Sequence, residues 1–260
     1  MALEHLLTFG VDPYSRPDLY DLEYEDYDED LVHYLSLARG RRSVLELGCG
    51  TGRLTVPIAR GGDRVLGIDR SEPMLGRLHE QLRAEPAAVR ERVRTQTGDF
   101  RSLDLGERFP LILLPFNAIH HCASDDEVRA VFAGVRRSLA PGGLFALDAY
   151  LPDMELYDRP RGERHEFQTF RDRETGADLH SWEESWWEPE RRVHHVVYVY
   201  VNQERGDTSR LHLQLHMREL DEWEDLLAEA GFEVISAASD FVGGALTASA
   251  LKWVVVLRAR

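Results

Sequence analysis

The chain has 260 residues, 43% of them hydrophobic, which is enough to bury a sizeable core in one α/β domain with an elaboration. Its formal net charge is −15, and such an acidic chain repels phosphate backbones, which argues against a nucleic-acid substrate. No run of about 18 apolar residues predicts a membrane span, and residues 1–17 lack the basic start and apolar core of a signal peptide, so we expect a cytoplasmic protein.

The spacing of cysteines and histidines predicts neither a disulfide framework nor a metal site. The two cysteines, Cys49 and Cys122, are not part of a CxxC pair. His212 and His216 stand on a predicted strand, where four residues span about 13 Å, too far for two ligands of one ion. We therefore expect no bound metal.

The first part of the chain alternates short apolar strands with amphipathic helices. Residues 1–30, rich in tyrosine and acids, predict an arm leading into a helix at 29–38, which Gly40 ends. Strands are predicted at 43–47, 65–69, 93–97, 111–116 and 144–148, helices at 54–60, 72–82 and 125–139, and a break at Pro141-Gly142-Gly143. This order predicts a doubly wound, Rossmann-like parallel sheet with helices on both faces.

Beyond residue 150 the pattern changes to aromatic and β-branched segments separated by turns. Strands at 166–171, 179–187, 193–202 and 210–218 predict an antiparallel sheet inserted into the parallel fold. A helix at 220–230 and strands at 233–237 and 252–258 complete a seven-stranded α/β fold. We therefore predict an arm and helix covering the ligand pocket at 1–40, an α/β domain at 41–153 and 219–260, and the inserted sheet at 154–218.

A glycine turn follows the first strand directly and opens a helix. Gly48, Gly50 and Gly52 in GCGTG let the backbone turn sharply and leave no Cβ between the chain and a ligand. The helix N-terminus adds N–H groups that favour a carboxylate or another negatively charged group. A tight turn that only packs strand against helix is the alternative.

Two acidic residues near the turn narrow the choice of ligand. Asp69 ends the second strand, where a carboxylate can accept hydrogen bonds from both hydroxyls of a ribose. Glu46 lies in an otherwise apolar strand, and a buried carboxylate needs a partner, for which a ligand's ammonium group is suited. An amino acid joined to a nucleoside satisfies both requirements.

These segments resemble the motifs of class I S-adenosylmethionine (SAM)-dependent methyltransferases. VLELGCGTGRLTVPIA is similar to the first motif, V-L-[DE]-x-G-x-G-x-G, and VLGIDRSEPML resembles the next, whose acid holds the ribose. TGDFRSL resembles the motif in which an aspartate approaches the adenine, and LAPGGLFALD is similar to the segment before the fifth strand. The resemblance implies an antiparallel last strand in the seven-stranded sheet, SAM as cofactor and S-adenosylhomocysteine as product.

The resemblance also implies, position by position, which residues bind SAM. The glycine turn with Cys49 lines the methionine moiety, Glu46 meets its amino group and Asp69 binds the ribose. For Met74 a place in the core, and for Asp99 a turn cap, are the alternatives to adenine contacts. The full predicted cofactor set is Tyr20, Glu46, Gly48, Cys49, Gly50, Gly52, Asp69, Arg70, Met74, Asp99, Phe100, Pro115, Phe116 and Asn117.

A nicotinamide dinucleotide is the rival cofactor, and its turn reads GxGxxG. The third glycine of that pattern falls at Arg53, whose side chain would obstruct the close approach of helix and strand. The sequence therefore argues against an NAD(P)-dependent oxidoreductase.

The methyl acceptor is expected over the end of the fourth strand. Pro115 and Phe116 are predicted to form a wall beside the methyl group, and Asn117 with His120 resembles an asparagine–histidine element of small-molecule methyltransferases. His120 and His121 are candidate general bases because histidine titrates near neutrality, whereas a structural role at a helix start is the alternative. The [DN]-P-P-[YF] element of enzymes that methylate exocyclic base amines is absent.

The arm and the insertion resemble parts of small-molecule N-methyltransferases. Tyr20-Asp21-Leu22-Glu23-Tyr24 is similar to a Y-D-x-x-Y segment that folds over the SAM pocket, and packing of its tyrosines on the core is the alternative. Tyr24 is the third catalytic candidate, since its hydroxyl can orient an amine and a ring face attracts the sulfonium cation. The insertion resembles the auxiliary sheet of aminosugar and glycine methyltransferases, which caps the site or makes a dimer.

The leading hypothesis is an enzyme that transfers the methyl group of SAM by in-line displacement to a small-molecule acceptor, at an amine nitrogen. A small-molecule O-methyltransferase and a non-catalytic SAM-binding scaffold or regulator are the alternatives. The predicted partners are the small acceptor and, through the inserted sheet, a second copy of the chain, with neither nucleic acid nor membrane.

Overall fold

The structure is a computed structural model that describes residues 10–172 and 175–260. The chain forms two compact units, a larger one of residues 27–152 and 218–260 and a smaller one that contains residues 10–26 and 153–217. The boundary between the units falls after Asp26, so the segment predicted as one part at 1–40 is divided between the two units. Residues 1–9 of the predicted arm lie outside the described residues. Among the described residues, no helix has the length and apolar character needed to cross a membrane.

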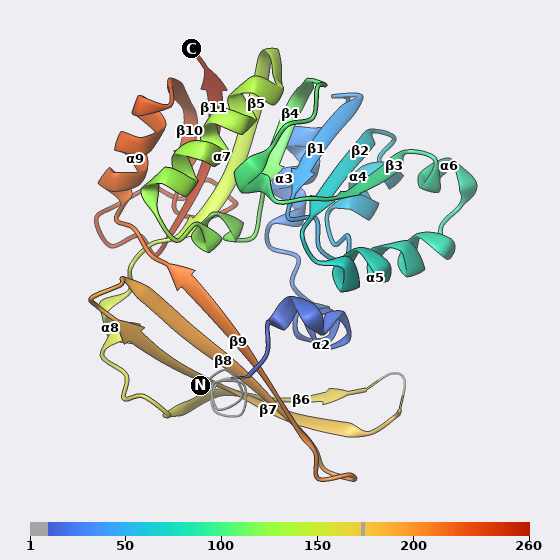
Figure 1. Cartoon of the computed structure of the whole chain (residues 1–260), viewed down its shortest axis with the longest axis vertical. Helices are drawn as coiled ribbons and strands as arrows, with labels where there is room; N and C mark the ends of the chain where they lie inside the picture. Colours follow the sequence, from blue (N-terminus) through green and yellow to red (C-terminus); the bar gives the residue numbers. More distant parts are fainter. Residues whose placement is uncertain (1–9, 173–174) are drawn as a thin grey trace. The chain divides into compact units, whose positions relative to one another are not determined.

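The larger unit is built on a seven-stranded sheet (Figure 1). The strand order is β10-β11-β5-β4-β1-β2-β3; β1 to β5 run parallel, and β11 pairs antiparallel with β5 and with β10. The strands are β1 Ser43–Leu47, β2 Arg64–Asp69, β3 Val93–Thr97, β4 Phe109–Leu114, β5 Leu139–Tyr150, β10 Phe232–Ala238 and β11 Lys252–Ala259. The predicted Rossmann-like fold with an antiparallel last strand is thereby confirmed.

The start of β5 differs from the prediction. The strand begins at Leu139 and runs through the Pro-Gly-Gly segment that was expected to break the chain. Leu139 pairs with Phe109, and regular pairing resumes with Leu111 opposite Leu144 after a register irregularity. The segment between them is an irregular extension of the strand, in which Gly142 adopts φ +72°.

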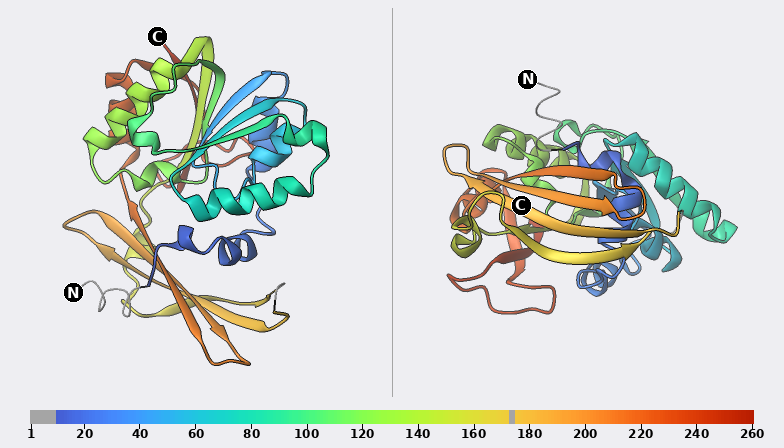
Figure 2. Two further views of the ribbon diagram at one scale, coloured as in Figure 1. Left: turned by 45° about the vertical axis from the view of Figure 1, so that its right-hand side comes forward. Right: turned by 90° about the horizontal axis from the view of Figure 1, so that it is seen from below.

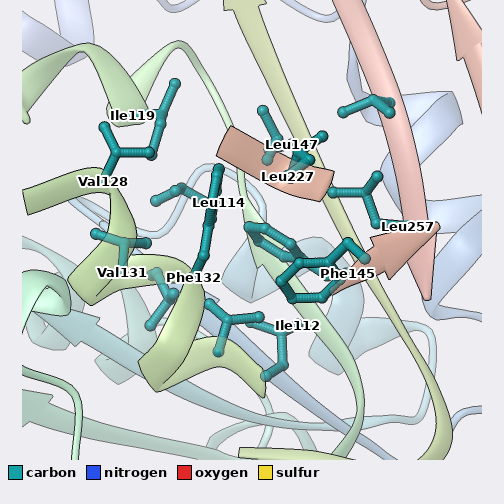
Figure 3. Packing of buried hydrophobic residues seen from close by; sticks show 14 of the residues in the cluster. Ile112, Leu114, Ile119, Val128, Val131, Phe132, Phe145, Leu147, Leu227 and Leu257 are labelled. Carbon is teal, nitrogen blue, oxygen red and sulfur yellow. The ribbon is translucent and has the colours of Figure 1, made fainter. Parts of the chain in front are cut away.

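Helices cover both faces of this sheet, as the prediction required. Phe132 and Leu227 pack with one side of the strands, and Figure 3 shows this cluster, whereas Tyr34 and Ile58 belong to a separate cluster that contains strand residues of opposite orientation. The helices of the unit are α3 Leu31–Ala38, α4 Thr55–Arg60, α5 Glu72–Arg83, α6 Ala87–Arg90, α7 Asp125–Ser138 and α9 Leu220–Glu229, with short η2 Phe100–Ser102 and η3 Ala118–His121.

Helix α7 shows how local sequence specifies one of these elements. The Ser124 hydroxyl caps the helix by accepting a hydrogen bond from the backbone N–H of Glu127 at 3.3 Å. Acidic residues fill its first turn and Arg136 and Arg137 its last, the arrangement that the helix dipole favours. The buried face repeats at helical spacing through Val128, Val131, Phe132 and Val135.

The smaller unit is a four-stranded antiparallel sheet with part of the N-terminal arm. The sheet order is β6-β7-β8-β9, and Figure 2 shows these strands from two directions, which confirms the predicted inserted sheet. On its face Leu19 of the arm packs with Tyr200 and Leu211. The elements are η1 Pro13–Ser15, α2 Pro17–Glu23, α8 Met154–Tyr157, β6 Arg164–Arg171, β7 Asp178–Glu188, β8 Val193–Asn202 and β9 Thr208–His216.

Candidate active site

The glycine turn between β1 and α4 requires residues without a side chain. Gly48, Gly50 and Gly52 adopt φ values of +71°, +54° and +94°. A Cβ on Gly52 would lie 2.2 Å from Cδ1 of Leu78 on α5, so the helix and the turn approach each other as closely as glycine permits. The turn therefore presents bare backbone at the carboxyl end of β1.

Cys49, predicted to line the cofactor, directs its side chain toward β2. Its Sγ lies only 2.7 Å from where a Cβ on Gly67 would stand, so Cys49 fills the space that this glycine leaves. Burial raises the pKa of the Cys49 thiol well above its usual range. The side chain is therefore a neutral packing group under the turn.

Asp69 ties the end of β2 to the glycine turn. Its Oδ2 accepts a hydrogen bond from the backbone N–H of Gly50 at 2.8 Å, and its Oδ1 accepts one from Ser71 at 2.8 Å. Burial is the largest influence on this carboxyl group and raises its pKa, while the exposed Arg70 beside it acts in the opposite direction. The carboxylate thus stands beside the glycine turn, as a ribose-binding role requires.

Glu46 is a carboxyl group inside the apolar core. Its side chain is 2% exposed, and Oε2 accepts a hydrogen bond from the Thr55 hydroxyl at 2.5 Å. Burial raises the pKa of Glu46 to about 8, so a cation is needed to keep it ionised at neutral pH. An ammonium group bound at the turn would supply that cation.

Arg53, which occupies the position of the third glycine in a dinucleotide turn, binds the residue that precedes α3. Its guanidinium makes two hydrogen bonds of 2.6 Å to the fully buried carboxylate of Asp30. It also lies over the ring of Tyr27 at 5.2 Å and over that of Phe116 at 4.8 Å. Sequence reasoning missed this bidentate pair, because Asp30 is one of many acids in its segment.

Asp99 and Phe100 follow β3. Asp99 caps η2 by accepting from the backbone N–H of Arg101 at 2.9 Å and forms an ion pair with the same residue at 2.6 Å. Its side-chain hydrogen bond with Arg101 lowers the pKa of the Asp99 carboxyl group. Asp99 therefore has the capping role that was the alternative to an adenine contact. The adenine contacts of Asp99 and of Phe100 stay predictions.

Met74 lies at the start of α5, with 1% of its surface exposed. Its Cε is 3.5 Å from the position that a Cβ on Gly50 would take, so it forms the floor below the turn. Its backbone N–H donates to the hydroxyl of Ser71, the helix cap, at 3.3 Å. Met74 is thus a core residue that also borders the glycine turn.

The end of β4 is a strained turn held by a buried carboxylate. Phe116 and Asn117, which follow the buried Pro115, adopt φ values of +59° and +58°, in the left-handed region that non-glycine residues rarely occupy. Asp148, 1% exposed, accepts from the backbone N–H of Phe116 at 2.7 Å and of Asn117 at 3.2 Å. The Tyr34 hydroxyl donates to the same carboxylate at 2.5 Å.

Sequence reasoning missed Asp148, although a signal was present. An acid closes the apolar strand LFALD, just as Glu46 interrupts LEL, and a buried carboxylate needs donors in both cases. Burial raises the pKa of Asp148, whereas its hydrogen bond with Tyr34 is the largest influence that lowers it. The donors around Asp148 come from α3 and from the end of β4, so the structure was needed to find them.

The two candidate histidines have different surroundings. His120 is fully buried, and its ring meets Trp223 of α9 edge-on at 5.8 Å between centroids. His121, the next residue on η3, is partly exposed. Both histidines lie on η3, directly after the Phe116–Asn117 turn, but only His121 has a solvent-accessible side chain.

Tyr20 and Tyr24 lie in the smaller unit. Their rings are 4.8 Å apart, and the Tyr24 hydroxyl is 3.0 Å from that of Tyr198 on β8. Beside them, the Tyr200 hydroxyl donates to Glu23 at 2.6 Å. The arm tyrosines therefore pack on the inserted sheet, which agrees with the alternative that they have a packing role.

Glu183 of β7 belongs to the same group of residues. It lies opposite Tyr198 in the sheet register, and burial raises its pKa to about 7, with Glu23 adding to the effect. Burial likewise raises the pKa of Glu23. We call Glu23, Tyr24, Glu183, Tyr198 and Tyr200 the tyrosine–carboxylate cluster; its carboxyl groups are only partly exposed and lie close together.

Two histidines of the inserted sheet form a stack with a tryptophan. Nδ1 of His195 is 2.9 Å from Nε2 of His212, and both rings stack near Trp186. Within residues 10–172 and 175–260, no group of three or more His, Cys, Asp or Glu residues is arranged to hold a metal ion.

Comparison with known proteins finds methyltransferases that are similar to this chain. A methyltransferase-domain model matches residues 44–143. The chain is 27% identical over 257 residues to the cypemycin N-terminal methyltransferase of a Streptomyces species, covering 94% of this chain and 98% of that protein. The CcbJ methyltransferase of Streptomyces caelestis has a TM-score of 0.78 at 26% identity, covering 95% of this chain and 98% of that one.

A further solved structure shares the fold. SAM-bound CalS10, an amino pentose methyltransferase from Micromonospora echinaspora, has a TM-score of 0.69 at 20% identity, covering 93% of this chain and 97% of that chain. At this identity the likeness concerns the fold alone.

The seven-stranded sheet, the glycine turn and Asp69 together define a Rossmann-like enzyme that binds a nucleoside-containing cofactor. The domain match and the relatives matched over nearly their whole length support a class I SAM-dependent methyltransferase. Its residues fit that cofactor: a Cβ at Gly52 would clash with Leu78, the buried Glu46 calls for a cation, and the Asp69 carboxylate lies beside the glycine turn.

Proposed function

We propose that this methyltransferase acts on a small-molecule acceptor and methylates an amine nitrogen. The observation that carries the choice of an amine is the match, over nearly the whole chain, to a relative named as an N-terminal methyltransferase. The names of two relatives support it, since cypemycin N-terminal methyltransferase and the amino pentose methyltransferase CalS10 are named for nitrogen-bearing substrates.

The proposed roles follow the positions of the side chains. SAM supplies an already activated methyl group when bound, so the chain has to align the acceptor, exclude water and remove one proton. Glu46 would hold the cofactor's amino group, Asp69 its ribose, and Phe116 would form the wall beside the acceptor. The remaining predicted cofactor contacts, including Tyr20, belong to this proposal.

Of the three proposed catalytic residues, we propose His121 and Tyr24 as the groups that touch the acceptor. The ring of His120 is enclosed between η3 and Trp223, a position suited to supporting the turn rather than to direct proton transfer. An amine that arrives as an ammonium ion must lose one proton before its nitrogen lone pair can attack the methyl group, and it leaves as the methylated ammonium while the sulfur leaves as S-adenosylhomocysteine. The partly exposed His121 is the proposed acceptor of that first proton.

The roles of the arm and of the inserted sheet also remain proposals. We infer that the arm covers the cofactor pocket and that the inserted sheet caps the site or joins two copies of the chain in a homodimer. Localisation in the cytoplasm stays a prediction from the sequence. Light scattering across a concentration series tests the dimer, and a monomer at all concentrations would contradict it.

Transfer of a labelled methyl group tests the proposed function. Purified protein, [methyl-¹⁴C]SAM and a library of small amines, each matched with the corresponding alcohol, should give labelled N-methyl products. Label confined to alcohols would replace the proposal by an O-methyltransferase, and SAM binding without any transfer would support a scaffold. The Asp69→Ala variant, in which cofactor binding is weakened, is the control for enzyme-dependent labelling.

A further inference from the structure

Lys252, the first residue of β11, is the only lysine among the chain's 31 basic residues. Its Nζ is 4.6 Å from the ring centroid of Phe241, 5.2 Å from that of Tyr150 and 6.0 Å from that of Tyr27. It also donates a hydrogen bond of 3.4 Å to the Tyr27 hydroxyl. Three rings from separate segments thus fix the position of one compact cation.

This cation keeps its charge available, unlike the neighbouring guanidinium. Arg53 is neutralised by two hydrogen bonds to Asp30, whereas in the described part of the chain no carboxylate forms an ion pair with Lys252. Asp148 is close enough for Lys252 to lower its pKa, but that carboxylate already accepts hydrogen bonds from Tyr34 and from the turn after β4. An ammonium carries three donors, and Tyr27 takes one.

Lys252 lies at the edge of the sheet where the acceptor is proposed to bind. It pairs with Tyr150 at the end of β5, the strand next to β4. Tyr27, whose hydroxyl accepts the hydrogen bond of Lys252, meets Phe116 with its ring edge-on at 5.2 Å. One ring therefore separates the ammonium from the residue proposed as the wall beside the methyl group.

We propose that Lys252 binds an anionic group, a carboxylate or a phosphate, of the methyl acceptor. The acceptor class is then an amine that also carries an anion, and the inference rests on the proposed function. A lysine suits this position because it is a compact point charge with three rotatable donors. All the other basic residues of the chain are arginines.

The single lysine makes a direct test possible without knowledge of the acceptor. Protein labelled with [ε-¹³C]lysine gives one side-chain signal, which is followed by NMR in the presence of saturating S-adenosylhomocysteine. Acetate, inorganic phosphate and chloride are titrated separately at constant ionic strength. We expect a saturable shift with acetate or with phosphate, and the anion that saturates names the group. The same small, unsaturable drift with all three salts would overturn the proposal.

Substitution then separates acceptor binding from a structural role. With an anionic amine found in the labelled-methyl screen, Lys252→Met should lower kcat/KM about tenfold or more, mainly through KM, and leave the affinity for S-adenosylhomocysteine within about twofold. Lys252→Arg, which keeps the charge, should recover part of the loss. An equal loss of cofactor affinity would instead mean that Lys252 only balances Asp148.

The two proposals fail in different ways. If no amine is methylated but the Lys252 signal still saturates with an anion, the choice of an amine is wrong and the anion site stands. If amines without an anionic group are methylated as efficiently as those with one, and the signal does not saturate, Lys252 has no role in recognition and the methyl-transfer proposal stands.

Discussion

Replacing Asp148 by asparagine should release the strained turn at the end of β4. Asparagine keeps the size of the side chain but provides one acceptor oxygen in place of two. Asp148 accepts from the backbone N–H of both Phe116 and Asn117, so in the variant one of these buried donors faces an amide NH₂ group. The left-handed conformation of the two residues then loses part of its support.

The magnitude follows from the same contacts. A buried donor without an acceptor costs about 1–3 kcal/mol. Relaxation of the left-handed turn can only reduce this cost, because the strain is already present in the wild-type structure. We therefore expect Asp148→Asn to lower the free energy of unfolding by about 1–3 kcal/mol. Because the turn is the proposed wall of the site, affinity for S-adenosylhomocysteine should also fall, by about tenfold.

Urea denaturation and titration calorimetry measure these two effects. Tyr34→Phe is the matched control, since it removes one hydrogen bond to Asp148 but leaves both backbone acceptors in place. It should cost about 1 kcal/mol and leave cofactor affinity within about twofold. An Asp148→Asn variant with wild-type stability would refute the structural account, and one that is destabilised but binds with wild-type affinity would refute the link to the site.

Three further predictions concern the glycine turn and its surroundings. Arg53→Met leaves the fully buried Asp30 without its bidentate partner and should cost about 3–5 kcal/mol in urea denaturation. Glu46, whose folded pKa of about 8 lies above the ordinary value of 4.5, favours folding when protonated, so wild-type stability should fall from pH 5 to 8 relative to Glu46→Gln. Gly52→Ala combines positive φ with a clash and should cost more than Gly62→Ala, where φ is +106° but no heavy atom lies within 4 Å.

Each of these predictions has its own contradiction. For the ion pair, the Arg53→Met/Asp30→Leu double variant should recover much of the lost stability, and failure to do so would mean that packing rather than charge is responsible. Parallel pH profiles for wild type and Glu46→Gln would show that the carboxyl group does not titrate between 5 and 8. An equal loss of unfolding free energy in the two glycine variants would mean that the turn can accommodate a Cβ at Gly52 without a clash.

The elements with local signals were predictable from the sequence. Strands such as β1, apolar and closed by glycines, and helices such as α7, with a serine cap and a periodic apolar face, depend on residues close together in the chain. The predicted start of β5 was wrong. Leu139 pairs with Phe109, and this tertiary contact extends the strand across a proline and two glycines.

The candidate site was predictable only where a motif carries it. The glycine turn and Asp69 were found because their spacing is local, and the structure links them by the hydrogen bond from Gly50. Asp148 was missed because its donors are up to 114 residues away, at Tyr34. The burial of His120 depends on Trp223, which belongs to a helix a hundred residues later, so no local pattern could reveal it.

Titration calorimetry with S-adenosylhomocysteine, NAD and NADP tests the central assignment most directly. The wild-type protein should bind one S-adenosylhomocysteine per chain and neither dinucleotide, and Asp69→Ala should weaken that binding about tenfold or more. Binding of a dinucleotide but not of S-adenosylhomocysteine, or unchanged affinity in Asp69→Ala, would contradict the cofactor site built around the glycine turn.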